Sequence, residues 1–411
     1  MSRVVFLGLN AYGHINPTLS IVKELISRGE EVVYIVADKY KDLITTTGCS
    51  QTEFKYSRFL FGSHHLKMQG RRSEDEFLES VKQFYESIEY QMTLANKLKQ
   101  LINSLKPDYI IHDSTLFYIK YICNELCVPC ISSVTLFAMN EKMFVESERL
   151  LSDFYNVNLK NSSKYVVNCI KEIGKEYSSK YGFVHNYFDN SMTKQGLNIV
   201  YTSKKFQPYN NLLDASYNFA GNNLMFRKLI EKKDEIDFLN KQKKVLVSFG
   251  SIMSDKDELV EFYNNMMNYF RKYDATFILN IGKLKKNMFD NIPDNFILKN
   301  GISQLQLLEV VDLFITHGGM NSVSEALQLN TPMIVIPQVM DQFIVADQVE
   351  KNGMGEMLNH TNINFAELED MISKILSSPT YINNIECISK SYRETGEEKT
   401  AVDKIFEFVG K

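Results

Sequence analysis

The chain has 411 residues, of which 44% are hydrophobic and 23% are charged, and its formal net charge is −4. This length is enough for two ordinary domains, and the slightly negative charge argues against a nucleic-acid-binding protein. The sequence contains no apolar stretch close to the ~20 residues that a membrane-spanning helix needs. The first residues, MSRVVFLGLN, are typical of a β-strand rather than of a signal peptide, so we expect a cytoplasmic protein.

Short β-branched and apolar runs alternate with helical patterns in the first half of the chain. A helix is predicted to begin at Asn16-Pro17, because Asn is a common N-cap and Pro is favoured in the first turn. A long charged helix is predicted over 74–105, and 138–195 is predicted to be helical without strands. The predicted strands are 3–9, 31–37, 108–113, 128–134 and 198–202.

The pattern weakens over 208–243, which we interpret as a linker, and then restarts. The second series of predicted strands is 245–249, 276–281, 296–298, 313–316 and 333–337. Two such series predict an α/β fold of two facing, Rossmann-like, doubly wound domains. We expect an N-terminal domain over 1–220, a C-terminal domain over 221–390, and a final helix over 391–411 that packs back on the N-terminal domain.

Six cysteines are present, and Cys127 and Cys130 form a C-x-x-C. A strand pattern follows them, whereas redox pairs usually lie at a helix start. No second pair completes a zinc site. We therefore expect ordinary buried thiols in a reducing compartment.

The stretch THGGMNSVSEA, residues 316–326, joins an apolar run to a helical pattern. Its glycines let the backbone approach a ligand closely. The first N–H groups of the following helix are unpaired and carry partial positive charge, which is typical of a phosphate site. Glu325 lies one helical turn after Asn321, on the same face, where it can accept hydrogen bonds from two ribose hydroxyls.

Structural interpretations of the same residues compete with phosphate binding. Ser322 and Glu325 have the spacing of a capping box, and His317 could be a histidine satisfied within the core. Asp341 and Gln342 follow the next predicted strand, where a carboxylate and an amide can bind sugar hydroxyls. Asp341 could instead cap the helix that follows.

Together these residues resemble the donor-binding signature of the family 1 glycosyltransferases, which use nucleotide sugars and have the glycosyltransferase B-type fold. The chain is most similar to the bacterial macrolide and natural-product branch. The resemblance runs from the first strand to the last helix and is strongest at 1–30, 243–252 and 300–356. The signature residues are His317, Asn321, Ser322, Glu325, Pro332, Pro337, Asp341 and Gln342.

The resemblance implies a role for each matching residue. His317 would contact the donor diphosphate, Glu325 the ribose, and Asp341 with Gln342 the transferred sugar. Further donor-binding residues implied in this way are Ser251, Ile302, Gln304, Gly319, Met320, Asn321 and Ser322.

The chain departs from the family pattern before Gln304. The family usually has Trp-x-Pro-Gln there, but this chain has Gly301-Ile302-Ser303-Gln304 and no tryptophan at all. No ring is therefore available at this position to stack on uracil, and only backbone groups of Ile302 are left to read the base edge. The identity of the base stays open.

The segment GLNAYGHINP, residues 8–17, follows the first strand and places His14 before the predicted helix start. A histidine there can act as a general base at neutral pH if a partner orients its other ring nitrogen. Asp113 ends another strand of the same domain and matches the aspartate partner in the family. His112 should point to the other face of the sheet, because strand side chains alternate. Alternatively, His14 is a structural histidine bonded to backbone.

The resemblance implies an inverting, metal-independent glycosyltransferase that moves a hexose from UDP-glucose to a hydroxyl of an apolar, macrolide- or flavonoid-like natural product. No cofactor, nucleic-acid partner or integral membrane association is expected. Acceptor-binding residues are predicted to be Phe117, Phe137 and Met139. The alternatives are a transferase with a lipid or membrane-linked acceptor, a nucleotide-sugar isomerase, and a catalytically silent nucleotide-sugar-binding protein.

Other short motifs are interpreted as structural. Asp255-Lys256-Asp257 spells the D-x-D of some metal-dependent transferases, but acidic residues are also favoured in a first helical turn. We interpret Arg71-Arg72 and His64-His65 as solvated loop residues.

Overall fold

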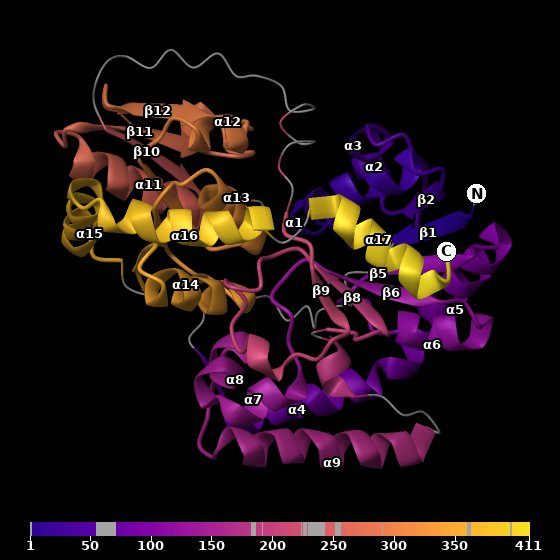
Figure 1. Ribbon diagram of the computed structural model, residues 1–411. Coiled ribbons are helices and arrows are strands. Elements are labelled where there is room, and N and C mark those ends of the chain that lie inside the picture. The colour runs from indigo at the N-terminus through magenta and orange to yellow at the C-terminus, as the bar shows by residue number, and fades with distance from the viewer. Residues whose placement is uncertain are drawn as a thin grey trace. The chain divides into compact units, whose positions relative to one another are not determined.

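A computed structural model gives the fold of the chain (Figure 1). It describes residues 2–54, 71–181, 186–190, 192–222, 224, 228, 243–250, 256–289, 291–359, 363–394 and 397–411. The chain divides into two compact units: unit 1 comprises Met1–Phe226 and Tyr392–Lys411, and unit 2 comprises Arg227–Ser391. These boundaries lie near the predicted ones.

Unit 1 is an α/β unit whose elements follow the predicted alternation. Its strands are β1 (Arg3–Leu7), β2 (Glu31–Ile35), β3 (Ser50–Thr52), β4 (Arg72–Ser73), β5 (Tyr109–Asp113), β6 (Cys130–Val134), β7 (Val157–Asn158), β8 (Leu197–Val200) and β9 (Tyr217–Phe219). Its α-helices are α1 (Tyr12–Ile15), α2 (Leu19–Ser27), α3 (Lys41–Thr45), α4 (Glu74–Glu86), α5 (Ile88–Leu105), α6 (Ile119–Leu126), α7 (Glu141–Glu146), α8 (Glu148–Tyr155), α9 (Ser163–Tyr181) and α17 (Glu397–Val409). Its 3-10 turns are η1 (Asn16–Thr18), η2 (Asp38–Tyr40), η4 (Tyr187–Asn190) and η5 (Asn210–Leu212).

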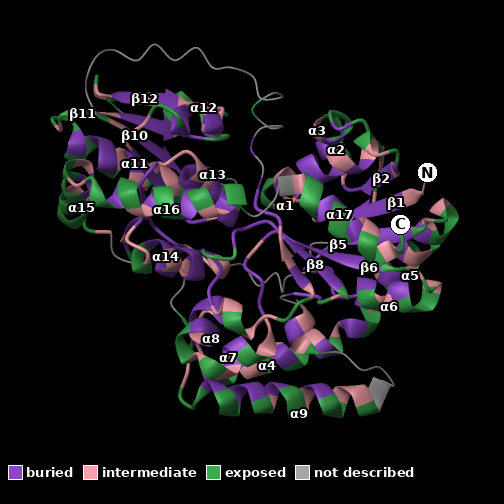
Figure 2. Ribbon diagram, viewed as in Figure 1, coloured by how far each residue is buried: buried purple, intermediate pink, exposed green. Residues whose placement is uncertain are grey.

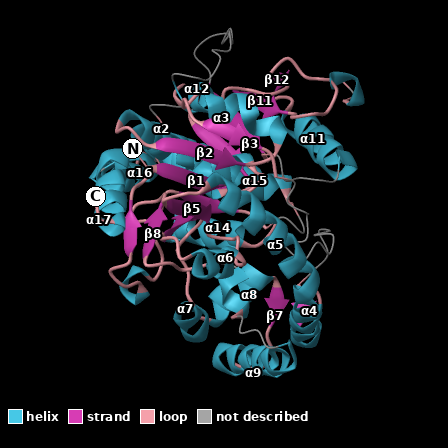
Figure 3. Cartoon of the chain, turned by 90° about the vertical axis from the view of Figure 1, so that its right-hand side faces the viewer, coloured by secondary structure: helices cyan, strands magenta, loops and turns pink. Residues whose placement is uncertain are grey.

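The main sheet of unit 1 has seven parallel strands in the order β3-β2-β1-β5-β6-β8-β9. Figure 3 shows β1 lying between β2 and β5. The chain runs outward from β1 through β2 to β3, and then returns to build the other half from β5. The strand order therefore reverses between β1 and β5, the place where doubly wound sheets carry their ligand sites.

Both faces of this sheet are covered, so its strands are nearly continuous apolar runs, and Figure 2 shows them buried. On one face Val5 and Leu7 belong to a cluster with buried residues of α5 and α6. On the other face Phe6 stacks on Tyr34 of β2, with ring centroids 4.7 Å apart. Side chains that alternate along a strand explain this division.

Several predicted elements of unit 1 need correction. The short strands β3, β4, β7 and β9 were not predicted, and β9 lies inside the predicted linker. The long helix divides at Ser87, whose hydroxyl donates to the Phe84 carbonyl oxygen (2.8 Å) in the local manner that weakens a helix. The first helical turn begins at Tyr12 rather than at Asn16, because the extended Ala11 carbonyl accepts from the His14 and Ile15 N–H groups.

Unit 2 has one six-stranded parallel sheet in the order β12-β11-β10-β13-β14-β15. These strands are β10 (Lys243–Ser248), β11 (Ala275–Asn280), β12 (Phe296–Lys299), β13 (Leu313–Thr316), β14 (Met333–Val335) and β15 (Gly355–Met357). Its helices are α11 (Lys256–Phe270), η6 (Lys286–Met288), α12 (Gln304–Leu308), α13 (Met320–Gln328), α14 (Asp341–Lys351), α15 (Phe365–Ser377) and α16 (Thr380–Glu394), the last of which continues into unit 1. The strand order reverses between β10 and β13, and β15 was not predicted.

The apolar core of unit 2 joins one face of the sheet to α11 and α15. Alternate strand residues such as Val245 and Val247 pack there against Tyr263 and Phe270 of α11 and Ile372 of α15. The core therefore fixes the strands, and the loops that follow them lie at one edge of the sheet.

The C-terminal helix α17 packs against α2 and the strands β8 and β9 within unit 1. Arg28, just after α2, bonds to both Glu24 and Asp403. The ammonium of Lys411 donates to both carboxylate oxygens of buried Glu30, at 2.6 and 2.5 Å. The last residue of the chain thereby pairs a buried carboxylate.

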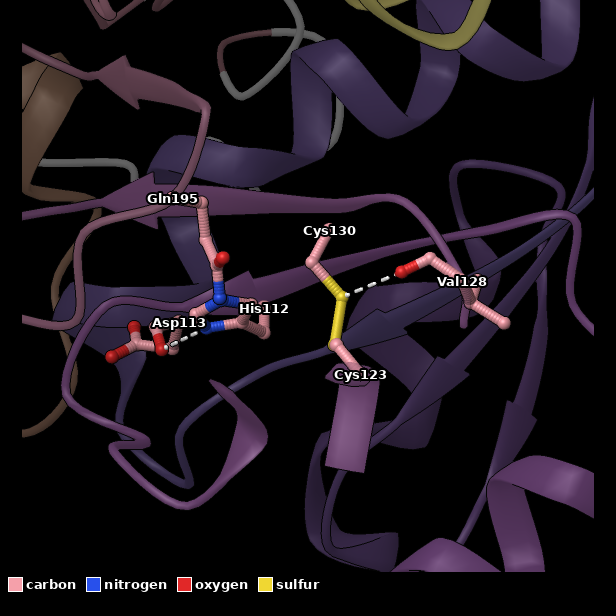
Figure 4. The surroundings of a disulfide bond; sticks show 6 residues. All are labelled: His112, Asp113, Cys123, Val128, Cys130 and Gln195. Carbon is pink, nitrogen blue, oxygen red and sulfur yellow. Dashed lines mark hydrogen bonds between the residues drawn. A yellow bond between two sulfur atoms is a disulfide. The ribbon is translucent and has the colours of Figure 1, made fainter. Parts of the chain in front are cut away.

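A disulfide joins Cys123, near the end of α6, to Cys130, the first residue of β6 (Figure 4). Their Cα atoms are 6.4 Å apart, because Cys127 adopts a left-handed conformation (φ 53°) that turns the chain back on itself. Our prediction of free thiols is therefore wrong for this pair. The prediction of buried thiols is also wrong for Cys127 and Cys387, which are exposed.

Candidate active site

In unit 1, His14 and Asp113 meet where the strand order reverses. His14 lies in α1, just beyond β1, and Asp113 is the last residue of the neighbouring β5. Leu7 and His112 are opposite each other in the parallel register, so the two strands end side by side. The Nδ1 atom of His14 is 2.8 Å from Oδ2 of Asp113.

Asp113 is buried, and its other oxygen is held locally. Its Oδ1 accepts from the Thr115 N–H at 3.0 Å and from the Thr115 hydroxyl. Burial would raise the pKa of the carboxyl, but the charge and hydrogen bond of His14, with the Thr115 bonds, outweigh burial and lower that pKa. An ionised carboxylate only accepts, so Nδ1 of His14 carries the hydrogen and Nε2 keeps its lone pair.

Thr135, the residue after β6, is a third member of this group that the sequence did not reveal to us. Its Oγ1 lies 2.8 Å from the same Nδ1 atom of His14, and the residue is only 2% exposed. The position could have been found, because β6 is the next strand beyond β5 and its end lies at the same edge.

His112 points to the other face of the sheet, as predicted, and is satisfied in the core. Its Nδ1 donates to the Asp113 carbonyl oxygen, and its Nε2 accepts from the Gln195 amide, both at 2.9 Å (Figure 4). Burial lowers the pKa of His112 to about 4. This histidine is therefore neutral and structural at neutral pH.

In unit 2, His317 follows β13 at the second strand-order reversal. Its ring is enclosed by two glycines: a Cβ atom on Gly250 would lie 2.7 Å from Cε1, and one on Gly319 would lie 2.6 Å from Nε2. Burial lowers the pKa of His317 to about 4, and a hydrogen bond with the Ser248 backbone offsets only part of this effect. The ring is thus neutral and closely confined. Predicted Ser251 lies outside the described residues.

The helix α13 begins at Met320, with Gly319 as its N-cap. No side chain caps it, and Ser322 lies inside the helix, so the capping-box interpretation is wrong. The first N–H groups of α13 follow directly after His317. Gly318 has a φ of 85°, and a Cβ atom there would lie 2.6 Å from the Val335 side chain, so this turn requires glycine.

Four predicted donor-binding residues form one hydrogen-bonded network. The Gln304 amide donates to Ser322 Oγ (3.2 Å) and to Glu325 Oε2 (2.7 Å). The Asn321 amide donates to the other oxygen of Glu325, which confirms that these two residues share a helix face. Glu325 is fully buried, so the network fixes the surface that Gln304 and Asn321 present. Ribose binding by Glu325 stays a prediction.

Asp341 and Gln342 are the first two residues of α14, and Met340 is its N-cap, so the interpretation of Asp341 as a cap is wrong. Gln342 is buried, and its Oε1 accepts from the Gln338 and Val339 N–H groups at 2.8 and 3.2 Å. Gln342 thus shapes the loop that presents Asp341. Met340 has φ 48° and ψ −121°, a conformation that costs a non-glycine residue energy.

The remaining predicted site residues are placed as follows. Ile302 is half-buried. It follows Gly301, which has a φ of 60°, and a Cβ atom added to Gly301 would meet no atom within 4 Å. Phe117, Phe137 and Met139 are all buried in unit 1, and their acceptor-binding role stays a prediction.

The motifs interpreted as structural need one correction. Arg71 pairs with Asp153, and the Arg72 guanidinium donates to the Tyr155 carbonyl oxygen at 2.8 Å, so these arginines are not merely solvated. Asp255 and the pair His64-His65 lie outside the described residues. Within the described ranges, no group of His, Cys, Asp and Glu is arranged to hold a metal ion, and none of the helices found there is long and apolar enough to cross a membrane.

Known proteins resemble this chain over its whole length. Residues 264–395 match the family model of the erythromycin biosynthesis protein CIII-like C-terminal domain. The uncharacterized UDP-glucosyltransferase YojK of Bacillus subtilis is 30% identical over 415 residues, covering 100% of this chain and 98% of the relative. The oleandomycin glycosyltransferase of Streptomyces antibioticus is 23% identical, covering 98% and 90%. The crystal structure of the calicheamicin glycosyltransferase CalG4 matches with a TM-score of 0.76 at 18% identity, covering 100% and 99%.

Proposed function

The chain belongs to the family of nucleotide-sugar-dependent glycosyltransferases, and we propose that it transfers a hexose from a UDP-sugar, UDP-glucose in particular, to a hydroxyl of a small apolar natural product. The proposed reaction inverts the anomeric configuration and uses no metal ion. The observation that carries the proposal is the 2.8 Å contact between His14 Nδ1 and Asp113 Oδ2.

This contact supports a general-base role for His14. The carboxylate keeps the hydrogen on Nδ1, so Nε2 carries the lone pair that takes a proton from an acceptor hydroxyl. As that proton leaves, the hydroxyl oxygen bonds to the anomeric carbon and the bond from that carbon to the diphosphate breaks. Asp113 stabilises the imidazolium that forms.

We propose that the nucleotide-sugar donor binds at the strand ends of unit 2. The N-terminus of α13 presents its first N–H groups and partial positive charge to a diphosphate. His317 lies beside it and is neutral in the free protein. A leaving diphosphate gains negative charge, so fixed donors at this place stabilise the transition state more than the ground state.

The acceptor class rests on the relatives. The relative from Streptomyces antibioticus acts, by its name, on oleandomycin, which supports a macrolide-like acceptor for this chain. The proposal that the donor carries uracil rests on the relatives named as UDP-glucosyltransferases. Against this, one structural relative is described in complex with thymidine diphosphate, so the test includes several bases.

The proposal is tested with UDP-, TDP- and GDP-glucose and a panel of macrolide and phenolic acceptors, with glucoside detected by mass spectrometry. The anomeric proton coupling in the product distinguishes inversion from retention. We expect His14→Ala to lower kcat about 10²- to 10⁴-fold, the usual contribution of a general base. His112→Gln is the matched control, because His112 is a neighbouring histidine that is satisfied in the core.

Each alternative has its own outcome. Undiminished turnover by His14→Ala rejects His14 as the base. Nucleotide binding without transfer to any acceptor supports a silent binding protein. Transfer only to a detergent-solubilised lipid acceptor supports the membrane-linked alternative, and donor conversion without acceptor supports an isomerase.

A further inference from the structure

Two oxygen atoms lie at the same distance from one ring nitrogen of His14. Asp113 Oδ2 and Thr135 Oγ1 are each 2.8 Å from Nδ1. Both residues are almost fully buried, at 2% exposure, and they come from the ends of adjacent strands that pair in parallel register. Thr135 is therefore held in place by the sheet rather than by a loose surface contact.

The chemistry of the three groups decides which atom donates. The Asp113 carboxylate has no hydrogen to give, so the single hydrogen on Nδ1 lies between His14 and the two oxygens. Thr135 Oγ1 then acts as a second acceptor for that hydrogen, which is shared between the two oxygens. If Thr135 donated instead, Nδ1 would be bare and would face an ionised oxygen at 2.8 Å, which is unfavourable.

A second acceptor restricts the ring in a way that one acceptor cannot. If the imidazole turned over about its Cβ–Cγ bond, a carbon atom would replace Nδ1, and both hydrogen-bond acceptors would lose their donor. The alternative tautomer, with hydrogen on Nε2, would likewise leave two acceptors facing a lone pair. Either alternative gives up both hydrogen bonds, so the correct ring orientation and tautomer are favoured by both contacts together.

We propose that Thr135 is a positioning residue of the transfer reaction, which keeps Nε2 of His14 unprotonated by accepting a second hydrogen bond from Nδ1. The role of His14 as base rests on the proposed function, whereas the hold on its ring does not. Thr135 acts through His14 and is not itself required to touch the substrate.

The first test needs no substrate. NMR of the protein labelled with ¹⁵N-histidine reports the tautomer of His14. The signals of His14 are identified as those missing from the spectrum of His14→Gln. In the wild type we expect only the Nδ1–H tautomer. Thr135→Val keeps the shape but removes the hydroxyl, and it should bring in a measurable Nε2–H population. Thr135→Ser should restore the wild-type spectrum. An unchanged spectrum in Thr135→Val overturns the proposal.

The second test measures turnover. Thr135→Val is expected to lower kcat about fivefold to tenfold, the rate equivalent of one lost hydrogen bond, while KM for the donor stays within about twofold. The acid limb of the pH profile should move to lower pH, because the missing acceptor costs the charged imidazolium more than it costs the neutral ring. The negative charge that faces the ring, Asp113, is the same in both proteins.

Thr202→Val is the matched control, because Thr202 is a buried threonine of the same unit whose hydroxyl bonds to Tyr392 at 2.8 Å. Equal losses of kcat in both variants, with no movement of the acid limb, overturn the proposal in favour of a structural role. If the wild type transfers no sugar while Thr135→Val still changes the tautomer, only the proposed function fails.

Discussion

The substitution Gly319→Ala tests whether the enclosed ring of His317 forms part of a diphosphate site. Gly319 has φ −60° and ψ 132°, a conformation that alanine adopts freely, so the backbone itself gains about 0.4–1 kcal/mol of stability from the change. The added Cβ atom would lie 2.6 Å from Nε2 and 3.1 Å from Cε1 of His317. The ring must therefore move by roughly 1 Å to reach ordinary contact distances.

The ring has little room to move, because Gly250 closes its other side. Overpacking of this kind costs about 1–3 kcal/mol. After the backbone gain is subtracted, the unfolding free energy of unit 2 should fall by up to about 2.5 kcal/mol. A displaced imidazole would also lose the proposed hydrogen bond to a bound diphosphate, and bonds to charged groups contribute about 1.5–3 kcal/mol. The dissociation constant should then rise about tenfold or more.

Urea unfolding measures the first effect, and calorimetric titration measures the second, using whichever of UDP, TDP and GDP binds the wild type most tightly. Gly13→Ala is the stability control, since a Cβ atom there meets nothing within 4 Å. His317→Ala gives the limit for loss of the ring. If Gly319→Ala lowers stability but binds nucleotide as the wild type does, the diphosphate does not contact His317. If Gly319→Ala lowers neither the unfolding free energy nor the nucleotide affinity, the ring of His317 is not enclosed as described.

Two further changes should alter stability. The unfolding free energy should fall as the pH is lowered from 6.5 to 4, by up to about 1.4 kcal/mol per pH unit for each buried neutral histidine. His112 and His317, with pKa values of about 4, stay unprotonated in the folded protein over this range, whereas the same residues take up protons in the unfolded chain. His112→Gln should flatten this dependence in urea unfolding, and an unchanged slope would contradict it. Lys411→Met should lower stability by about 2 kcal/mol, because it removes the ammonium that pairs buried Glu30. Adding Glu30→Gln should recover part of that loss in thermal unfolding, and no recovery would reject the ion pair as its cause.

The sequence was sufficient to predict the two parallel sheets and the pairing of His14 with Asp113. The pairing rested on the resemblance to the family, and the structure supplies its physical reason: β1 and β5 are adjacent, so polar residues that follow them lie at the same edge of the sheet. The strands that were missed, such as β3 and β9, are only three residues long, too short to show a repeated apolar alternation.

Other features depend on distances in space that residue types do not encode. The spacing of Cys123 and Cys130 was compatible with free thiols, and only the left-handed turn at Cys127 brings their Cα atoms within bonding range. The spacing Ser322-x-x-Glu325 fits a capping box equally well as a hydrogen-bonded network. It was the start of α13 at Met320 that decided between them.

The return of the chain to unit 1 at Tyr392 has a consequence for how the protein can be divided. Unit 2 is one continuous segment inserted between two parts of unit 1, which is therefore discontinuous in sequence. A fragment that ends near residue 226 would lack α17 and expose the surfaces of α2 and β8 that this helix covers, as well as leaving Glu30 without its lysine. Unit 2 can be excised with a single pair of cuts, but unit 1 needs its two segments joined or supplied together.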